Sequence, residues 1–189
     1  MVYTLQKWQW DVNYQEPVMR YNFNTIVYRN RRFYEQRRPL LPQPVRKESV
    51  EFLEERLAQQ KLFHDLRKSS LAVLAVPVFP ELIRPTADLQ GLTTLPVKED
   101  LDEFWNTQIA EVVWLKSITQ DLSELKRVSA VNSDSIEVTA AVVADFTIKD
   151  TLIYPCFVGI LASKTVTGET SRIFTVKAEF KEVFVDWEL

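Results

Sequence analysis

The clearest hydrophobic pattern lies near the C-terminus, where apolar and polar residues alternate through 172–184. The apolar positions are Phe174, Val176, Ala178 and Phe180, and each is followed by a polar residue. Because successive side chains of a strand point to opposite faces, this pattern predicts a strand with one face in a core and the other in water. Glu182 interrupts the alternation, which predicts a bulge or the end of the strand there.

Shorter apolar segments predict strands through much of the remaining chain. A nearly all-apolar run at 71–79, closed by Pro77 and Pro80, is typical of a buried strand. Polar turn signals occur at 132–134 and 167–169. The other strand candidates are 21–28, 112–118, 125–131, 135–143 and 153–162.

Residues 49–68 have the pattern of a helix. Acidic residues lie near the start of this segment, basic residues lie near its end, and apolar residues fall roughly on one stripe. We therefore expect a helix that packs on a sheet. The predicted fold class is α+β and mostly β, an antiparallel sheet packed by one helix.

Composition excludes several classes of protein. At 189 residues and 46% hydrophobic, the chain is long enough to bury a core. Its three glycines do not form a P-loop or a dinucleotide-binding turn. Cys156 is the single cysteine and His64 the single histidine, so neither an internal disulfide nor an all-protein zinc site is expected. We expect no cofactor and no bound metal.

The N-terminal residues lack the apolar core of a signal peptide, and no apolar run reaches the roughly 20 residues of a membrane span. We expect no membrane association. The charge is uneven, since residues 1–68 hold 13 basic and 8 acidic groups and the remainder hold 10 and 18. This asymmetry could steer head-to-tail association, or the basic half could meet nucleic acid.

Few residues suggest chemistry. The acidic group Glu99, Asp100, Asp102 and Glu103 lacks the ordered spacing and the glycine of a calcium loop, so a solvated segment is the better interpretation. His64 falls on the predicted helix, where a surface or packing role is commoner than a role as general base. We assign no catalytic residue.

A basic cluster spans residues 29–47, interleaved with Phe33 and Tyr34. Its members are Arg29, Arg31, Arg32, Arg37, Arg38, Arg46 and Lys47. Cations with stacking rings are typical of single-strand nucleic-acid surfaces. However, Glu35 lies inside the cluster and no recognised nucleic-acid module surrounds it, which favours an oligomer contact or a plain surface. Three prolines in 33–45 make that segment an irregular or edge strand.

Tryptophans lie at both ends of the chain, at Trp8, Trp10 and Trp187. They are expected to pack the termini together or to anchor a neighbouring subunit.

The order of these features resembles bacteriophage distal tail and tail-tip (baseplate) structural proteins. In that family a tryptophan-containing strand is followed by a strand with a Gly-x-Glu-x-Arg signature, a helix, a Val-Pro-aromatic strand, an inserted small β-barrel, and a Tyr-Pro strand with a closing hairpin. The matching residues here are Trp10, Thr25-Ile26, Glu35, Arg37, Val76-Pro77-Val78-Phe79 and Tyr154-Pro155. Phe33 stands in place of the signature glycine, and Phe79 stands where the family usually has tryptophan.

The resemblance implies a non-enzymatic protein of the virion tail tip, assembled in the host cytoplasm. It would form a homo-oligomeric ring, a hexamer or trimer, that joins the tail tube to the central hub and contacts the tape-measure protein. Residues 1–84 and 153–189 would form the ring-forming domain, and residues 85–152 an inserted small β-barrel. The candidate inter-subunit contacts are Arg32, Glu35, Arg37, Arg38, Trp8, Trp10 and Trp187.

Two alternatives stay open from the sequence. One is a nucleic-acid-binding module that uses the basic cluster, with affinity that falls steeply with salt. The other is a carbohydrate-binding or hydrolytic accessory protein of a virion, which would need paired carboxylates and an exposed tryptophan platform such as Trp105 or Trp114.

Overall fold

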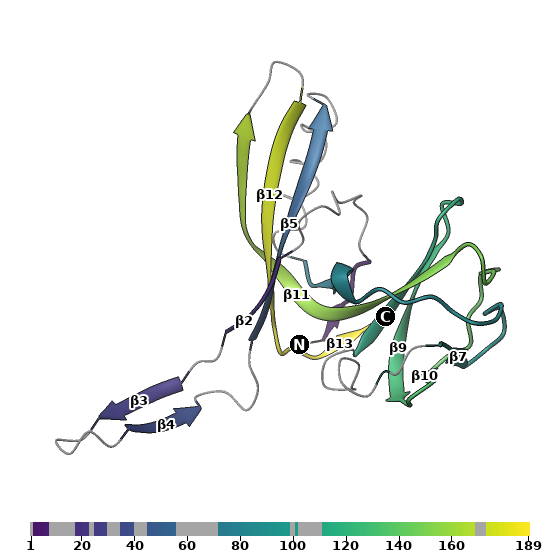
Figure 1. Cartoon of the computed structure of the whole chain (residues 1–189), viewed down its shortest axis with the longest axis horizontal. Coiled ribbons are helices and arrows are strands. Elements are labelled where there is room, and N and C mark those ends of the chain that lie inside the picture. The colour runs from purple at the N-terminus through teal and green to yellow at the C-terminus, as the bar shows by residue number, and fades with distance from the viewer. Residues whose placement is uncertain are drawn as a thin grey trace.

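The computed structural model describes residues 2–7, 18–22, 25–29, 35–39, 45–55, 72–98, 101, 111–168 and 173–189. Within these ranges the chain is almost entirely β (Figure 1). The strands are β1 (Tyr3–Thr4), β2 (Val18–Asn22), β3 (Thr25–Arg29), β4 (Glu35–Pro39), β5 (Val45–Glu55), β6 (Leu74–Pro77), β7 (Thr94–Pro96), β8 (Val112–Ser117), β9 (Ser123–Val131), β10 (Ser135–Val138), β11 (Thr151–Gly168), β12 (Ile173–Glu182) and β13 (Trp187–Glu188). One short 3-10 helix, η2, spans Phe79–Glu81.

Nine strands form one sheet in the order β2-β5-β12-β11-β8-β9-β10-β7, with β6 paired to β11 beside this path. All pairings in this sheet are antiparallel. A second pair, β3-β4, is an antiparallel hairpin, and β1-β13 is a parallel pair that brings the two ends of the chain together. The predicted antiparallel, mostly β class is confirmed.

The long strand β11 joins the two parts of the sheet. Its first residues pair with β8, its middle with β6, and its last residues with β12. Gly159 lies where β6 and β12 both pair with β11. A Cβ atom there would stand 2.8 Å from Cε2 of Phe157, so the close packing at this point requires glycine.

Two elements extend away from the core in Figure 1. Strands β5, β12 and the second half of β11 form a three-stranded ribbon, and β3-β4 projects in another direction. We call these the ribbon and the hairpin arm. The residues that join the ribbon to the core around Arg46 and Glu182 are called the root of the ribbon.

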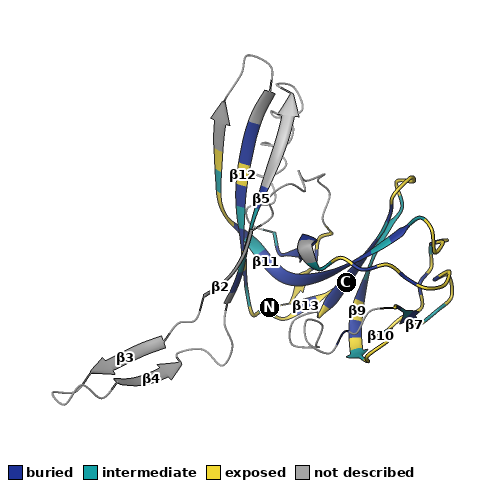
Figure 2. Cartoon of the chain, in the orientation of Figure 1, coloured by how far each residue is buried: buried dark blue, intermediate teal, exposed yellow. Residues whose placement is uncertain are grey.

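The core consists of two hydrophobic clusters on opposite faces of β8. Val112 and Trp114 belong to the first cluster, whereas Val113 and Leu115 belong to the second. The first cluster follows β6, β11 and β12, where Figure 2 shows the buried segments meeting. All members of the second cluster fall within residues 83–153. This range is close to the predicted inserted domain, whose boundaries stay a prediction.

The predicted helix at 49–68 is wrong over its first part. Residues up to Glu55 belong to β5, which hydrogen-bonds β2 on one side and β12 on the other. Val50 is buried opposite Ala178 on β12. Pairing on both edges satisfies the backbone and buries Val50, and this tertiary context outweighs the local helical pattern. Residues 56–68 lie outside the described part of the chain.

Apart from the three-residue η2, the described ranges contain no helix, and no helix packs the sheet there. The described strands also do not close a barrel, since β7 and β2 end the path of the nine-stranded sheet. The predicted strands agree better with the structure than the predicted helix does. The run at 71–79 contains the buried strand β6, and 33–45 contains β4, which pairs only with β3 among the described strands.

Candidate functional site

The hairpin arm carries three of the predicted contact residues. Glu35 stands opposite Arg29 in the register of β3 and β4, while Arg37 stands opposite Val27 and Arg38 opposite Ile26. Opposite charges at directly paired positions favour a strand pairing. The expected role of Glu35, Arg37 and Arg38 as inter-subunit contacts stays a prediction. Arg32, Trp8 and Trp10 lie outside the described residues, as do His64 and the acidic group at 99–103.

Trp187 packs inside its own chain. It pairs with Tyr3 across the parallel β1-β13 pair, and only 8% of its surface is exposed. Its indole Nε1–H donates a hydrogen bond to Oε2 of Glu111 at 3.1 Å, and the guanidinium carbon of Arg127 lies 4.6 Å from the ring centroid. Trp187 therefore lies buried in the strand pair that joins the two ends of the chain.

A buried ion pair holds the root of the ribbon. Arg46 and Glu182 are 4% and 6% exposed. Nε of Arg46 donates to Oε1 of Glu182 at 2.9 Å, and the backbone N–H of Arg46 donates to Oε2 at 2.9 Å. A further bond joins Nη2 of Arg46 to Oε1. Arg46 also lies over the ring of Phe157, with 5.4 Å from guanidinium carbon to ring centroid.

Sequence reasoning missed this pair because Glu182 was interpreted as a break in the alternating pattern. The strand does end at Glu182, as expected. Nevertheless, Glu182 keeps the phase of Val176, Ala178 and Phe180, and like them it is buried. A charged residue in the apolar phase of a strand requires a buried partner, and that signal could have predicted a buried ion pair at Glu182 without identifying Arg46 as its partner.

The described side chains of the basic cluster are already engaged within the chain. Arg46 binds Glu182, and Nζ of Lys47 lies 3.0 Å from Oε1 of Glu179. Of the other five positions, Arg29 belongs to β3, Arg37 and Arg38 belong to β4, and two lie outside the described residues. This internal pairing removes two of the seven cations from a nucleic-acid surface.

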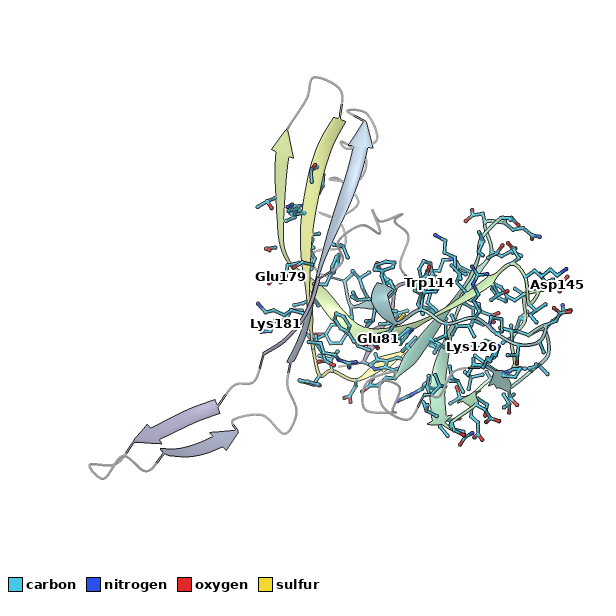
Figure 3. All side chains as sticks on the ribbon, in the orientation of Figure 1. Glu81, Trp114, Lys126, Asp145, Glu179 and Lys181 are labelled. Atoms are coloured by element: carbon cyan, nitrogen blue, oxygen red, sulfur yellow. The ribbon has the colours of Figure 1, made fainter. Side chains whose placement is uncertain are left out.

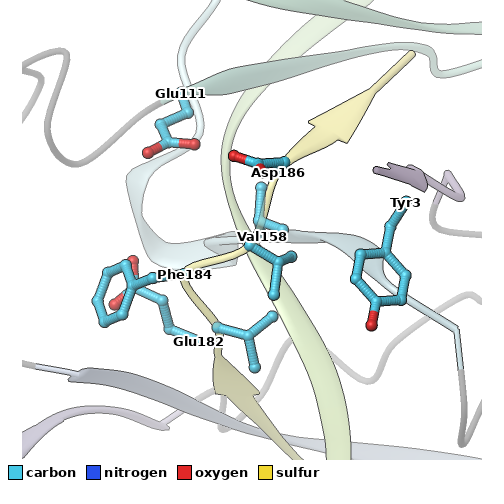
Figure 4. Close-up of a pocket in the computed structure, with 8 residues that line it drawn as sticks. Tyr3, Glu111, Val158, Glu182, Phe184 and Asp186 are labelled. Carbon is cyan, nitrogen blue, oxygen red and sulfur yellow. The ribbon is translucent and has the colours of Figure 1, made fainter. Parts of the chain in front are cut away.

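A groove of about 520 Å³ lies beside the root of the ribbon (Figure 4). Its lining residues are Tyr3, Glu111, Val158, Glu182, Val183, Phe184, Val185 and Asp186. In Figure 4 the rings of Tyr3 and Phe184 lie on opposite sides of the groove, with Val158 and Asp186 between them. The groove therefore combines aromatic and acidic groups at one end of the first hydrophobic cluster.

Three carboxyl groups outside the groove have pKa values shifted by burial or by hydrogen bonds. Burial raises the pKa of Glu81, although the charge of Arg46 acts in the opposite direction. Burial would also raise the pKa of Glu124, but hydrogen bonds from Lys126, Ala144 and Val143 outweigh it and lower the pKa. The hydroxyl of Ser117 donates to Asp150 and is the main cause of its lowered pKa. These last two groups fix turns rather than form a reactive site.

Little in the described residues suits catalysis or cofactor binding. No group of three or more metal-ligating side chains lies together there. Trp114 is only 3% exposed and packs on Tyr154, so it offers no exposed stacking platform. Trp105 lies outside the described residues. Cys156 is fully buried. Across the same ranges, no helix has the length and hydrophobicity needed to cross a membrane.

No known family model matches this sequence, and no curated protein is significantly similar to it.

Proposed function

We propose that this chain is a non-enzymatic structural protein of a phage tail tip or baseplate, forming an oligomeric ring that joins the tail tube to the central hub. The order of sequence features that resembles distal tail proteins is the basis of the proposal. The hairpin arm is the structural observation that supports this proposal most strongly. This arm contains Glu35 and Arg37, the acidic and basic positions of the family signature, in one projecting two-stranded element (Figure 1).

The hairpin arm is expected to be only marginally stable in an isolated monomer. Its strands are five residues each and pair only with one another among the described strands. A single two-stranded hairpin is marginally stable in water, and unpaired strand edges are templates for pairing with another chain. A partner surface that covers the arm would supply the missing contacts.

The root of the ribbon supports the same role. A buried ion pair is weak evidence for net stability, and the hypothesis for this chain is that the pair contributes a defined geometry. The Arg46–Glu182 pair would set the direction in which the ribbon leaves the core, which a repeated assembly contact requires. We further propose that residues 85–152 are an inserted domain built on the second hydrophobic cluster.

Replacement of Glu35 by alanine tests the role of the arm. Glu35→Ala is expected to reduce ring formation strongly while changing the midpoint of urea unfolding little, because the arm lies apart from both hydrophobic clusters. Native mass spectrometry reports the assembly and tryptophan fluorescence reports the unfolding. Glu137→Ala, on the exposed side of β10, is the matched control. An equal loss of assembly and stability would place Glu35 in the monomer core and contradict the proposed role.

A further inference from the structure

The groove beside the root of the ribbon has the chemistry of a guanidinium site. Three carboxylates line it, from Glu111, Glu182 and Asp186, and none of its described lining residues is a lysine or arginine. Two aromatic rings stand at its sides, with Tyr3 37% and Phe184 51% exposed. An arginine head group combines hydrogen bonding to carboxylate with stacking on a ring, so this lining suits it better than the compact ammonium of lysine.

Two of the three carboxylates keep capacity for a ligand. Glu182 is neutralised by Arg46. Glu111 accepts the indole N–H of Trp187 through Oε2, and its Oε1 makes no hydrogen bond or ion pair with the described residues. The carboxylate of Asp186 makes no hydrogen bond or ion pair with the described residues, and only its backbone oxygen is used, by the N–H of Tyr3. A negatively charged groove of this kind attracts a cationic segment.

The most strongly basic segment of the chain is the hairpin arm. Residues 25–39 hold five arginines and one glutamate, a net charge of +4. In Figure 1 the arm projects away from the body of its own chain. Each strand of five residues spans about 17 Å, so the arm reaches well beyond the root.

We propose that the groove lined by Tyr3, Glu111, Phe184 and Asp186 receives arginine side chains of the hairpin arm of a second copy of this chain. The charge complementarity between the −2 of Glu111 and Asp186 in the groove and the +4 of residues 25–39 in the arm carries the proposal. In a head-to-tail arrangement the arm of each copy enters the groove of the next copy, and a repeated contact of this kind closes a ring when its rotation permits. The inference rests on the proposed function and names the surfaces that meet.

Charge reversal on each surface tests it with the full-length chain. One variant is Asp186→Arg in the groove, and the other is the double replacement Arg37→Asp with Arg38→Asp in the arm. Each alone is expected to shift native mass spectra from the assembled species to the monomer, with at least a tenfold higher concentration needed for assembly. An equimolar mixture of the two is expected to restore assembly into rings with an even number of subunits, such as a hexamer, because the acidic side chains introduced into the arm can pair with the basic side chain introduced into the groove.

Matched controls reverse charges away from both surfaces. One control is Asp121→Arg, at an exposed residue in the turn between β8 and β9. The other is the double replacement Arg84→Glu with Lys149→Glu, at two exposed residues in the 83–153 range that holds the second hydrophobic cluster. These controls are expected to assemble like the wild type. Circular dichroism and urea unfolding of every variant separate a folding defect from an assembly defect. A variant that does not fold is replaced by the milder Asp186→Asn or Arg38→Gln.

A disulfide-trapping experiment gives an independent readout. Chains with Asp186→Cys are mixed with chains that carry Arg38→Cys under mild oxidation. A mixed disulfide dimer supports the contact, and the native Cys156 is fully buried and adds little background.

The outcomes separate this inference from the proposed function. Loss of assembly in each variant, with recovery in the mixture, supports both. Assembly of the wild type that persists in both variants, without trapped disulfide, overturns the groove contact and leaves the ring intact. Sensitivity of only the groove variant indicates that a different basic segment fills the groove and also overturns the inference. A wild-type chain that stays monomeric at every concentration overturns the ring and the contact together.

Discussion

Loss of the negative charge at Glu182 is expected to destabilise the monomer strongly. The perturbation is Glu182→Gln, which keeps the size of the side chain and removes its charge. Arg46 then keeps a buried positive charge without its carboxylate, with both side chains only 5% exposed in the native protein. Removal of one partner of a buried ion pair costs about 3–5 kcal/mol. The lower end, near 3 kcal/mol, is expected because Gln can still accept a hydrogen bond and Glu81 also interacts with Arg46.

A neighbouring ion pair supplies the matched control. Lys47 and Glu179 come from the same two strands, but their side chains are 28% and 32% exposed. Figure 3 shows Glu179 on the ribbon, away from the crowded body that contains Glu81 and Trp114. An exposed pair contributes about 0–1 kcal/mol, so Glu179→Gln is expected to change the free energy of unfolding by less than about 1 kcal/mol.

Urea unfolding monitored by tryptophan fluorescence measures both variants at one fixed, low protein concentration. With a denaturant slope of about 2 kcal/mol/M, a loss of 3 kcal/mol lowers the midpoint by about 1.5 M. The double variant Arg46→Met/Glu182→Leu is expected to recover most of the stability, because an apolar pair of similar size avoids the desolvation of two charges. Equal, small losses for Glu182→Gln and Glu179→Gln would refute the assignment of a buried, structurally important pair at the root.

Two further substitutions test the close packing at Gly159 and the effect of burial on Glu81. Gly159→Ala is expected to lower the free energy of unfolding by about 1–3 kcal/mol in urea titrations, because the added Cβ would meet Phe157 and the backbone oxygen of Lys181, and a fully wild-type midpoint would argue against the close packing there. Glu81→Gln is expected to stabilise the protein at pH 7. Because burial raises the pKa of Glu81 above its ordinary 4.5, the protonated form suits the fold and the wild type loses stability as pH rises through that raised pKa. The gain is therefore expected to shrink at pH 4, and a gain that is the same at both pH values would contradict this cause.

The strand content of the C-terminal half could be predicted from the sequence because local patterns there agree with the final contacts. Residues Val176, Ala178 and Phe180 alternate and are buried, so one face of β12 was evident before the partners were known. The β9–β10 turn at 132–134 likewise has local chemistry that specifies it, and the backbone N–H of Asn132 donates to the backbone oxygen of Ser135.

Elements that depend on distant partners could not be predicted. The first part of the predicted helix is strand β5 in the structure, because β2 and β12 pair with it on its two edges. Neither pairing can be recognised from the local sequence pattern. The Arg46–Glu182 pair joins residues 136 positions apart, so spacing along the chain gives no hint of it. The groove likewise combines β1, the 182–186 segment and Glu111, which only the fold brings together.

The proposed function requires this chain to assemble with copies of itself into a closed ring. Native mass spectrometry of the full-length protein over a concentration series, with negative-stain images of any large species, tests it most directly. The expected result is a discrete closed ring, a hexamer or trimer, whose subunit number is fixed across concentrations. A strict monomer at every concentration would contradict it.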